Sequence, residues 1–302
     1  MSDPIRLFVF GLGYTGSAFA RAMKGKANWI GGTTRSAEKA AALTAEGFRP
    51  FIFDAAGDGP GAGVAEAVKL ATHVLISIAP TESEATKGEA DPVIARHRQS
   101  ILAAAKLRWV GYLSTVGIYG NYGGAWVSEA TTPHPTRERS TLRLASENAW
   151  TKLAAERDVT LAVFRIAGIY GPGRNAFVNL DEGNAHRVAK PGQVFNRIHV
   201  DDIVTTIAAA LGASAAGIFN LADDEPAPPQ DVVTYAATLM GVKPPVEVPL
   251  ELAVLSPMAR SFYGENKRVA NRRIKQELGV KLRYPTYREG LTALWRSGTW
   301  RS

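Results

Sequence analysis

Three glycines near the start of the chain, Gly11, Gly13 and Gly16, have the spacing G-x-G-x-x-G. The apolar residues 7–10 before them are typical of a buried strand, and residues 17–23 after them are mostly good helix formers. In such a unit the first glycine permits the turn, the second lets a pyrophosphate approach the backbone, and the third lets helix and strand pack closely. The N–H groups that begin the helix would face the phosphates. The pattern predicts a dinucleotide-binding turn rather than a simple glycine turn, with contacts from Gly11, Gly13, Tyr14, Thr15 and Gly16.

The second expected strand, residues 29–34, ends where a dinucleotide site places the residue that contacts the ribose. That residue is acidic in proteins that bind NAD, but the first carboxylate after this strand is Glu38. Thr34 and Arg35 instead offer a hydroxyl and a guanidinium, which suit a 2′-phosphate. We therefore expect NADP in preference to NAD; the alternative is that Arg35 is an ordinary surface arginine.

Two further strand ends are candidates for the same site. The strand expected at 51–54 closes with Asp54, which either contacts the adenine or caps a loop. The strand expected at 73–79 closes with Ser77, Ile78 and Ala79, which would pass beside the cofactor at the carboxyl edge of the sheet. The polar segment 81–91 that follows is long enough to form a lid, and disorder is the competing interpretation.

Strands and helices alternate up to residue 170, which predicts an α/β fold with a Rossmann-type, doubly wound parallel sheet. We expect a NAD(P)-binding domain of residues 1–170, to which 200–222 return through a strand at 218–221. Residues 171–199 and 223–302 are expected to form a smaller C-terminal substrate-binding lobe, with a helix at 231–240.

The composition is that of an ordinary globular protein, with 302 residues, 46% hydrophobic and 21% charged. The absence of cysteine excludes disulfides and thiolate chemistry, and the five histidines lack ligand-like spacing, so we expect no metal. The first strand begins close to Met1, and the longest uncharged stretch, 203–222, is too polar for a membrane helix. These features predict a cytoplasmic protein.

The net charge of +7 is concentrated at the end of the chain, because residues 260–302 contain eleven Lys or Arg and three Asp or Glu. Such a region favours anionic small molecules or polyanions, although a solvated basic surface explains it as well. We do not expect nucleic-acid binding, since the basic segment has no recognition motif. The candidates for binding an anionic substrate are Arg174, Arg197 and Arg268.

Four segments together resemble an extended or atypical short-chain dehydrogenase/reductase of the NAD-dependent epimerase/dehydratase group. The first is the glycine turn at 11–16. The others are Tyr112-Leu-Ser-Thr-Val-Gly-Ile-Tyr-Gly120, Phe164-Arg-Ile-Ala-Gly-Ile-Tyr-Gly-Pro-Gly173 and Arg197-Ile-His-Val-Asp-Asp202. The resemblance covers most of the chain and indicates the group, but it says little about the substrate.

The resemblance implies roles for residues after the fifth strand. Thr115 matches the Ser or Thr that bonds the reacting oxygen. The family's tyrosine acid–base and the lysine four residues later correspond to Arg139 and Arg143. Arginine stays protonated, with a pKa above about 12, so Arg139 cannot exchange protons near neutrality, whereas Arg143 could still donate to ribose hydroxyls. By position, Tyr119 or Tyr122 could supply the proton instead.

Other residues near these segments have structural interpretations. Arg139 and Arg143 are expected either to form an anion-binding edge or to be exposed, with Arg143 paired to Glu147 one turn later. Asp201 and Asp202 are expected to cap the helix 203–211. His199 is expected to be a packed strand residue.

Two functions fit these observations. The first is an NADP-dependent oxidoreductase or epimerase/dehydratase-like protein that acts on a small, anionic carbonyl or sugar-derived compound. The second is a catalytically impaired NADP-binding redox sensor or regulatory protein of the same fold, which the arginines in place of Tyr and Lys favour.

Overall fold

The computed structural model describes residues 4–57, 59–81, 89 and 91–302. These fall into two compact units. The first unit contains residues 1–115, 137–165 and 204–219, and the second contains 116–136, 166–203 and 220–302. Residues 116–136, which were expected in the NAD(P)-binding domain, therefore belong to the second unit.

A seven-stranded parallel sheet forms the centre of the first unit, in the order β11-β7-β5-β4-β1-β2-β3. Its strands are rich in buried apolar residues, as expected for a sheet covered on both faces. The predicted α/β fold is confirmed, and the strand expected at 218–221 does return to the sheet. In chain order the strands are β1 (Arg6–Phe10), β2 (Trp29–Thr34), β3 (Arg49–Ile52), β4 (His73–Ile76), β5 (Trp109–Thr115), β7 (Thr160–Ile166) and β11 (Gly217–Leu221).

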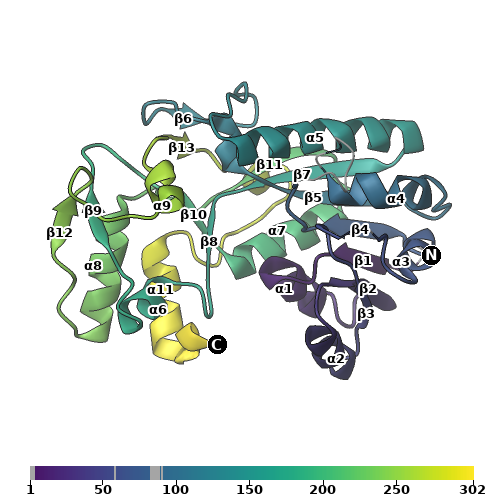
Figure 1. Ribbon diagram of the computed structural model, residues 1–302, viewed down its shortest axis with the longest axis horizontal. Coiled ribbons are helices and arrows are strands. Elements are labelled where there is room, and N and C mark those ends of the chain that lie inside the picture. The colour runs from purple at the N-terminus through teal and green to yellow at the C-terminus, as the bar shows by residue number, and fades with distance from the viewer. Residues whose placement is uncertain (1–3, 58, 82–88, 90) are drawn as a thin grey trace. The chain divides into compact units, whose positions relative to one another are not determined.

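Helices cover both faces of this sheet (Figure 1). The helices α3, α4 and α5 bury Val68, Ile101 and Trp150 against Phe8 and Tyr112 of the sheet. Figure 1 shows α1 on the opposite face. The helix bounds are α1 (Tyr14–Ala22), α2 (Ala37–Ala45), α3 (Val64–Lys69), α4 (Pro92–Leu102), α5 (Glu138–Arg157) and α7 (Val200–Gly212).

The strand order reverses at β1, which pairs in parallel with β2 on one side and with β4 on the other. In open α/β sheets the crevice at such a switch point, outside the carboxyl ends of the strands, is where ligands bind. The glycine turn follows β1 at this edge, Ser77 follows β4, and Thr115 ends the next strand, β5. The fold of the first unit thus brings the predicted cofactor residues to one edge.

The second unit has short elements around an aromatic core. Phe177, Val232, Tyr287, Leu291 and Trp300 are all buried there in one cluster. Its two-stranded ladders pair β8 with β10, β9 with β12 and β6 with β13. The elements are η2 (Val116–Tyr119), β6 (Trp126–Val127), β8 (Gly168–Tyr170), α6 (Ala176–Asp181), β9 (Arg187–Ala189), β10 (Arg197–His199), α8 (Pro229–Met240), β12 (Glu247–Pro249), α9 (Pro257–Phe262), β13 (Arg268–Val269), α10 (Arg272–Gln276), α11 (Tyr287–Ser297) and η3 (Thr299–Arg301).

The prediction that Asp201 and Asp202 cap a helix at 203 is wrong. The helix α7 begins at Val200, so both aspartates lie in its first turn. The buried Asp202 carboxylate accepts hydrogen bonds from the backbone N–H groups of Arg283, at 2.6 Å, and Tyr284, at 3.0 Å. Asp202 therefore holds a distant chain segment against the helix, a long-range contact that helix-capping rules do not consider.

His199 is a packed strand residue, as predicted. It is buried, and its ring contacts the rings of Tyr170, at 5.1 Å, and Tyr284, at 4.2 Å. Burial lowers the pKa of His199 to about 4, which keeps the imidazole neutral near pH 7. Within the described residues, no three His, Asp or Glu side chains are grouped to hold a metal ion, and no helix has the length and apolar character to cross a membrane.

Candidate functional site

The glycine turn has a geometry that side chains would disturb at two of its three glycines. Gly11 has φ +91°, a left-handed conformation that favours glycine. A Cβ on Gly16 would lie 2.2 Å from the carbonyl oxygen of Gly11, so helix and turn approach too closely for any side chain. A Cβ built on Gly13 would have no atom of the described residues within 4 Å, apart from the residues next to it in the chain. A side chain would project from Gly13 into open space, which leaves room for a ligand to reach the backbone.

The helix that follows the turn begins without a side-chain cap. Gly13 is the N-cap residue of α1, and the first turn contains no acidic residue. The N-terminal N–H groups and their partial positive charge are therefore not offset by a local carboxylate. This arrangement suits a phosphate.

Thr33, which was not among the predicted site residues, fixes the turn from the neighbouring strand. Its buried hydroxyl accepts a hydrogen bond from Gly11 N at 2.8 Å, and its carbonyl accepts one from Leu12 N at 2.7 Å. A threonine after two strand glycines gives no signal of this role, because the contact joins residues that are 22 positions apart.

Arg35 is exposed immediately after β2, while the preceding Thr34 is buried. The next hydroxyl, Ser36, accepts a hydrogen bond from Lys39 N at 3.2 Å and caps α2. Ser36 is thus engaged as a helix cap, and Arg35 is an exposed cationic group directly after β2.

The strand ends proposed to border the cofactor differ from expectation. The strand β3 ends at Ile52, before Asp54. The exposed Asp54 carboxylate accepts a hydrogen bond from Ala56 N at 3.1 Å. Asp54 therefore caps a loop, which was the alternative to contact with the adenine. The strand β4 ends at Ile76, before Ser77.

Ser77 and Ile78 nevertheless lie beside the turn, since a Cβ on Gly11 would be 3.0 Å from the Ile78 side chain and 3.2 Å from the Ser77 carbonyl carbon. Ala79, the next residue, is exposed. Most of the segment 81–91, a predicted lid, lies outside the described residues.

Thr115 ends β5 half-buried, and the residue before it belongs to a buried polar network. Ser114 donates a hydrogen bond to the Glu147 carboxylate. Arg165 contacts the same carboxylate with Nη2 at 2.8 Å and with Nε at 3.3 Å. This network joins α5, β5 and β7 next to Thr115. Sequence patterns did not indicate it, because its members are far apart in the chain.

Arg139 and Arg143 have different environments on α5. Arg139 is exposed. Arg143 is half-buried and donates to the Leu113 carbonyl at 2.8 Å and to the Tyr112 hydroxyl at 3.3 Å. Its guanidinium carbon lies 5.7 Å from the centre of the Tyr112 ring. The expected pair of Arg143 with Glu147 is therefore wrong, because Glu147 points inward to its buried partners.

The two tyrosines considered as substitute acids are engaged in hydrogen bonds within the second unit. Tyr119 is fully buried and donates to Asn220 Oδ1 at 2.8 Å. Tyr122 donates to the Thr132 carbonyl at 2.6 Å. Each hydroxyl proton already has a protein acceptor, which argues against either tyrosine as the general acid.

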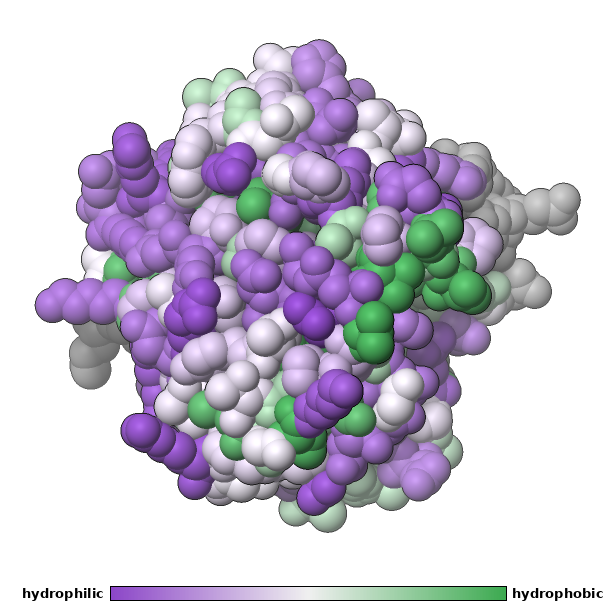
Figure 2. Space-filling model, turned by 90° about the vertical axis from the view of Figure 1, so that its left-hand side faces the viewer, coloured by the Kyte–Doolittle hydropathy of each residue, from purple (hydrophilic) through white to green (hydrophobic). Residues whose placement is uncertain are grey.

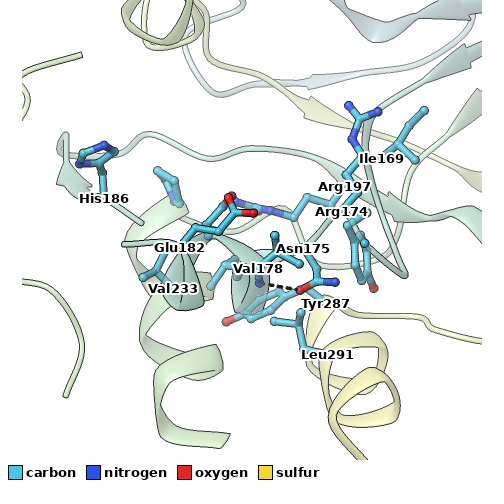
Figure 3. A pocket seen from close by; sticks show the side chains of 16 residues that line it. Ile169, Arg174, Asn175, Val178, Glu182, His186, Arg197, Val233, Tyr287 and Leu291 are labelled. Carbon is cyan, nitrogen blue, oxygen red and sulfur yellow. Dashed lines mark hydrogen bonds between the residues drawn. The ribbon is translucent and has the colours of Figure 1, made fainter. Parts of the chain in front are cut away.

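Two of the three arginines predicted to bind an anion, Arg174 and Arg197, line one cavity of about 590 Å³ in the second unit (Figure 3). We call this cavity the α6–α8 pocket. The third, Arg268, is not in its wall; it donates to the Gly124 carbonyl. The pocket is lined by Ile169, Tyr170, Gly173, Arg174, Asn175, Ala176, Val178, Asn179, Glu182, His186, Arg197, Pro229, Val232, Val233, Tyr287 and Leu291.

Burial strongly affects the charged groups around Arg197. Nη1 of Arg197 donates to the carbonyls of Phe195, at 3.0 Å, and Ala227, at 3.2 Å, while burial lowers the pKa of this guanidinium. Burial also raises the pKa of the Asp223 carboxyl to about 8, although the charge of Arg197 opposes this shift. Burial therefore opposes ionisation of the Asp223 carboxyl, and the neighbouring charge of Arg197 favours it.

Solved structures of other proteins resemble this chain over nearly its whole length, although no family model matches it. A conserved protein of unknown function from Silicibacter pomeroyi is 46% identical and has a TM-score of 0.86, with 97% of this chain and 98% of that chain covered. The dTDP-glucose 4,6-dehydratase of Streptomyces venezuelae, solved with NAD bound, is 17% identical and has a TM-score of 0.77, with 97% of this chain and 96% of that chain covered.

Among curated proteins, a 3-diazoavenalumate denitrifying reductase from Streptomyces is 31% identical over 46% of this chain and 49% of that protein. This chain thus matches about half the length of that relative. The extent of the Silicibacter pomeroyi match shows common membership of one family. The protein belongs to the family of that conserved Silicibacter pomeroyi protein and has the fold of the NAD-dependent epimerases and dehydratases, the short-chain dehydrogenase/reductase group that its sequence motifs resemble.

Proposed function

We propose that the protein is an NADP-dependent oxidoreductase or an epimerase/dehydratase-like enzyme that acts on a small anionic carbonyl or sugar-derived compound. The observation that carries the proposal is the glycine turn at the switch point of the sheet. It combines a left-handed Gly11, an open Gly13 and an uncapped helix N-terminus. The NAD bound to the related dehydratase and the reductase activity named for the curated relative support the same class.

The residues present fit a nicotinamide dinucleotide. The open side of Gly13 would receive the pyrophosphate, with Gly11, Tyr14, Thr15 and Gly16 around it. Ser77 and Ile78 would border it from the segment that follows β4. Arg35 would bind a 2′-phosphate, because a guanidinium forms charge-assisted hydrogen bonds with phosphate oxygens. When bound, such a cofactor would supply or accept a hydride.

Thr115 and Arg143 are the candidates for orienting reacting groups in the first unit. Thr115 would donate a hydrogen bond to the substrate oxygen, as the family resemblance implies. Arg143 is anchored through Nη1 to the carbonyl end of β5 and would direct its remaining N–H groups to ribose hydroxyls. No role is proposed for Arg139 or Tyr119 in proton transfer, since the first stays protonated and the second donates to Asn220. We propose that the proton comes from solvent.

A catalytically impaired redox sensor is the second candidate, and the environment of α5 favours it. In place of the family's acid–base tyrosine the helix presents an exposed arginine, and in place of its lysine an arginine already bonded to β5. Such a protein would bind NADP without turning over a substrate. It would sense the NADP redox state and act through a partner.

Two measurements test these functions. Fluorescence titration with NADPH and NADH should show tighter binding of NADPH, and Arg35→Asp should reverse the order. Equal affinities in the parent protein would remove the role given to Arg35. Oxidation of NADPH in the presence of a panel of carbonyl compounds is followed by the loss of absorbance at 340 nm. This assay separates the enzyme from the sensor, because only the enzyme consumes the cofactor.

A further inference from the structure

We propose that Glu147 and Arg165 are positioning residues of the cofactor site. They act through Ser114, whose hydrogen bond to the Glu147 carboxylate fixes the end of β5. Thr115 and the carbonyl that anchors Arg143 lie at that end. The inference rests on the proposed function, because its readout is the binding of NADPH, and it uses residues of the first unit alone.

The end of β5 is tied to α5 twice. The Leu113 carbonyl accepts a hydrogen bond from Nη1 of Arg143 at 2.8 Å, and the next residue, Ser114, donates to the Glu147 carboxylate. Arg143 and Glu147 are four residues apart, so they lie on one face of α5, one turn from each other. Two successive strand residues are thus held by two successive turns of one helix. This double tie sets the position of Thr115, the next residue of the strand, relative to Arg143.

Arg165 fixes the orientation of the Glu147 carboxylate. Its Nη2 donates to Oε2 at 2.8 Å, and its Nε lies 3.3 Å from each carboxylate oxygen. Both side chains are buried, at 4% and 5% exposed, and charge-assisted hydrogen bonds of this kind are strong and directional. Because β7, which carries Arg165, neighbours β5 in the sheet, the sheet itself holds the carboxylate that holds Ser114.

Stability alone does not account for a buried ion pair at this place. Tyr112 of β5 and Trp150 and Leu153 of α5 belong to one buried apolar cluster, so the helix already packs on the strand without charges. Taking two charges out of water is costly, and apolar residues of similar volume often stabilise a fold as well as a buried ion pair does. What the pair adds is the direction of its hydrogen bonds, which apolar packing lacks.

Calorimetry on the full chain with two probes separates positioning from general damage to the site. NADPH carries the nicotinamide ribose that Arg143 would hold, whereas adenosine 2′,5′-bisphosphate lacks that ribose and keeps the 2′-phosphate that Arg35 would bind. Ser114→Ala should weaken NADPH binding about fivefold, as expected for the loss of a hydrogen bond. It should change the affinity for the bisphosphate by less than about twofold. An equal loss for both probes, or unchanged NADPH affinity, would overturn the proposal.

The same substitution in an apolar background tests whether Ser114 acts through the ion pair. Glu147→Leu with Arg165→Met removes both charges together, so neither is left buried without the other. We expect this double variant to fold and to bind NADPH about fivefold more weakly than the parent. Adding Ser114→Ala should then change the affinity by less than about twofold, because the hydroxyl has already lost its acceptor. A further loss as large as in the parent would overturn the proposal.

An exposed ion pair between α4 and α5, Arg98 with Glu156, supplies the matched control. Arg98→Met with Glu156→Leu should leave the affinities for both probes unchanged, and a loss equal to that of the buried pair would overturn the assignment. Ser114→Ala retains the buried ion pair, so it decides the question by itself if the apolar double variant does not fold.

The parent protein separates this inference from the proposed function. If the parent binds NADPH and Ser114→Ala binds it equally well, the inference alone is overturned. If the parent binds neither probe, the proposed function is overturned and the inference with it.

Discussion

The glycine turn of the first unit and the α6–α8 pocket of the second are both candidate ligand sites, but they are built from different parts of the chain. The turn is formed by consecutive residues, and its important groups are backbone N–H donors and the absence of Cβ atoms. The pocket is formed by side chains from segments more than 100 residues apart, such as Arg174 and Tyr287. The first site should therefore be disrupted by adding atoms and the second by removing them.

Figure 2 shows the surface of the second unit in mixed polar and apolar patches, with green areas among purple ones. Exposed apolar side chains there include Val246, Leu252, Val254 and Met258. A surface of this kind gives no clear indication of the pocket.

The largest effect on stability is expected from Gly16→Val. The added Cβ would lie 2.2 Å from the Gly11 carbonyl oxygen, and that backbone atom cannot move without displacing the turn. We expect a loss of about 3 kcal/mol or more in the free energy of unfolding, similar to severe overpacking. Urea denaturation measures it. A loss below about 0.5 kcal/mol would show that the turn and α1 do not pack as closely as described.

A pH-dependent effect is expected from Asp223→Asn in the second unit. Burial raises the pKa of the folded carboxyl to about 8, against an ordinary value of 3.8. The native state therefore holds the proton more tightly than the unfolded chain. The protonated state contributes its full stability below about pH 4, and this contribution is lost as pH rises through about 8.

The asparagine variant should lose this dependence. Between pH 5 and pH 8 the stability of the parent should fall relative to the variant by up to about 1.4 kcal/mol per pH unit. Denaturant midpoints at pH 5, 6.5 and 8 measure the difference. Parallel curves for the two proteins would show that Asp223 ionises normally.

The cofactor preference is a smaller expected effect. In Arg35→Asp a carboxylate would replace the guanidinium and repel a 2′-phosphate. NADPH should bind about tenfold or more weakly, with little change for NADH. Arg49→Asp, at an exposed arginine that begins β3, is the control and should leave both affinities unchanged. A similar loss for both cofactors in Arg35→Asp would mean that the arginine does not contact the 2′-position.

The smallest predicted difference compares the two arginines of α5. Arg143→Met removes hydrogen bonds to Leu113 and Tyr112 and should cost about 1 to 2 kcal/mol. Arg139→Met, at an exposed position one turn earlier, should change stability by less than about 0.5 kcal/mol. Thermal unfolding of the two variants gives the comparison. Equal costs would contradict the different environments described.

The contrast between the two sites also shows what the sequence could predict. The sheet and the glycine turn follow from local patterns, namely apolar runs, glycine spacing and helix formers within about 20 residues. Thr33, Glu147 and Asp202 were missed or misassigned because their partners are 18 to 82 positions away. Arg174, Arg197 and Arg268 were predicted to bind an anion from their charge alone. The tertiary structure shows that Arg174 and Arg197 line one pocket, whereas Arg268 does not.

The central claim, that the first unit binds a nicotinamide dinucleotide at the glycine turn, is tested most directly by NADPH titration of Gly13→Val. Gly212→Val is the matched control, because a Cβ on Gly212 also meets no described atom within 4 Å outside its own helix and chain neighbours, and its φ is not left-handed. We predict that Gly13→Val remains folded but loses NADPH binding at least a hundredfold, since its side chain would fill the space that the pyrophosphate needs. The control should bind as the parent does. Unchanged NADPH affinity in a folded Gly13→Val protein would contradict the claim.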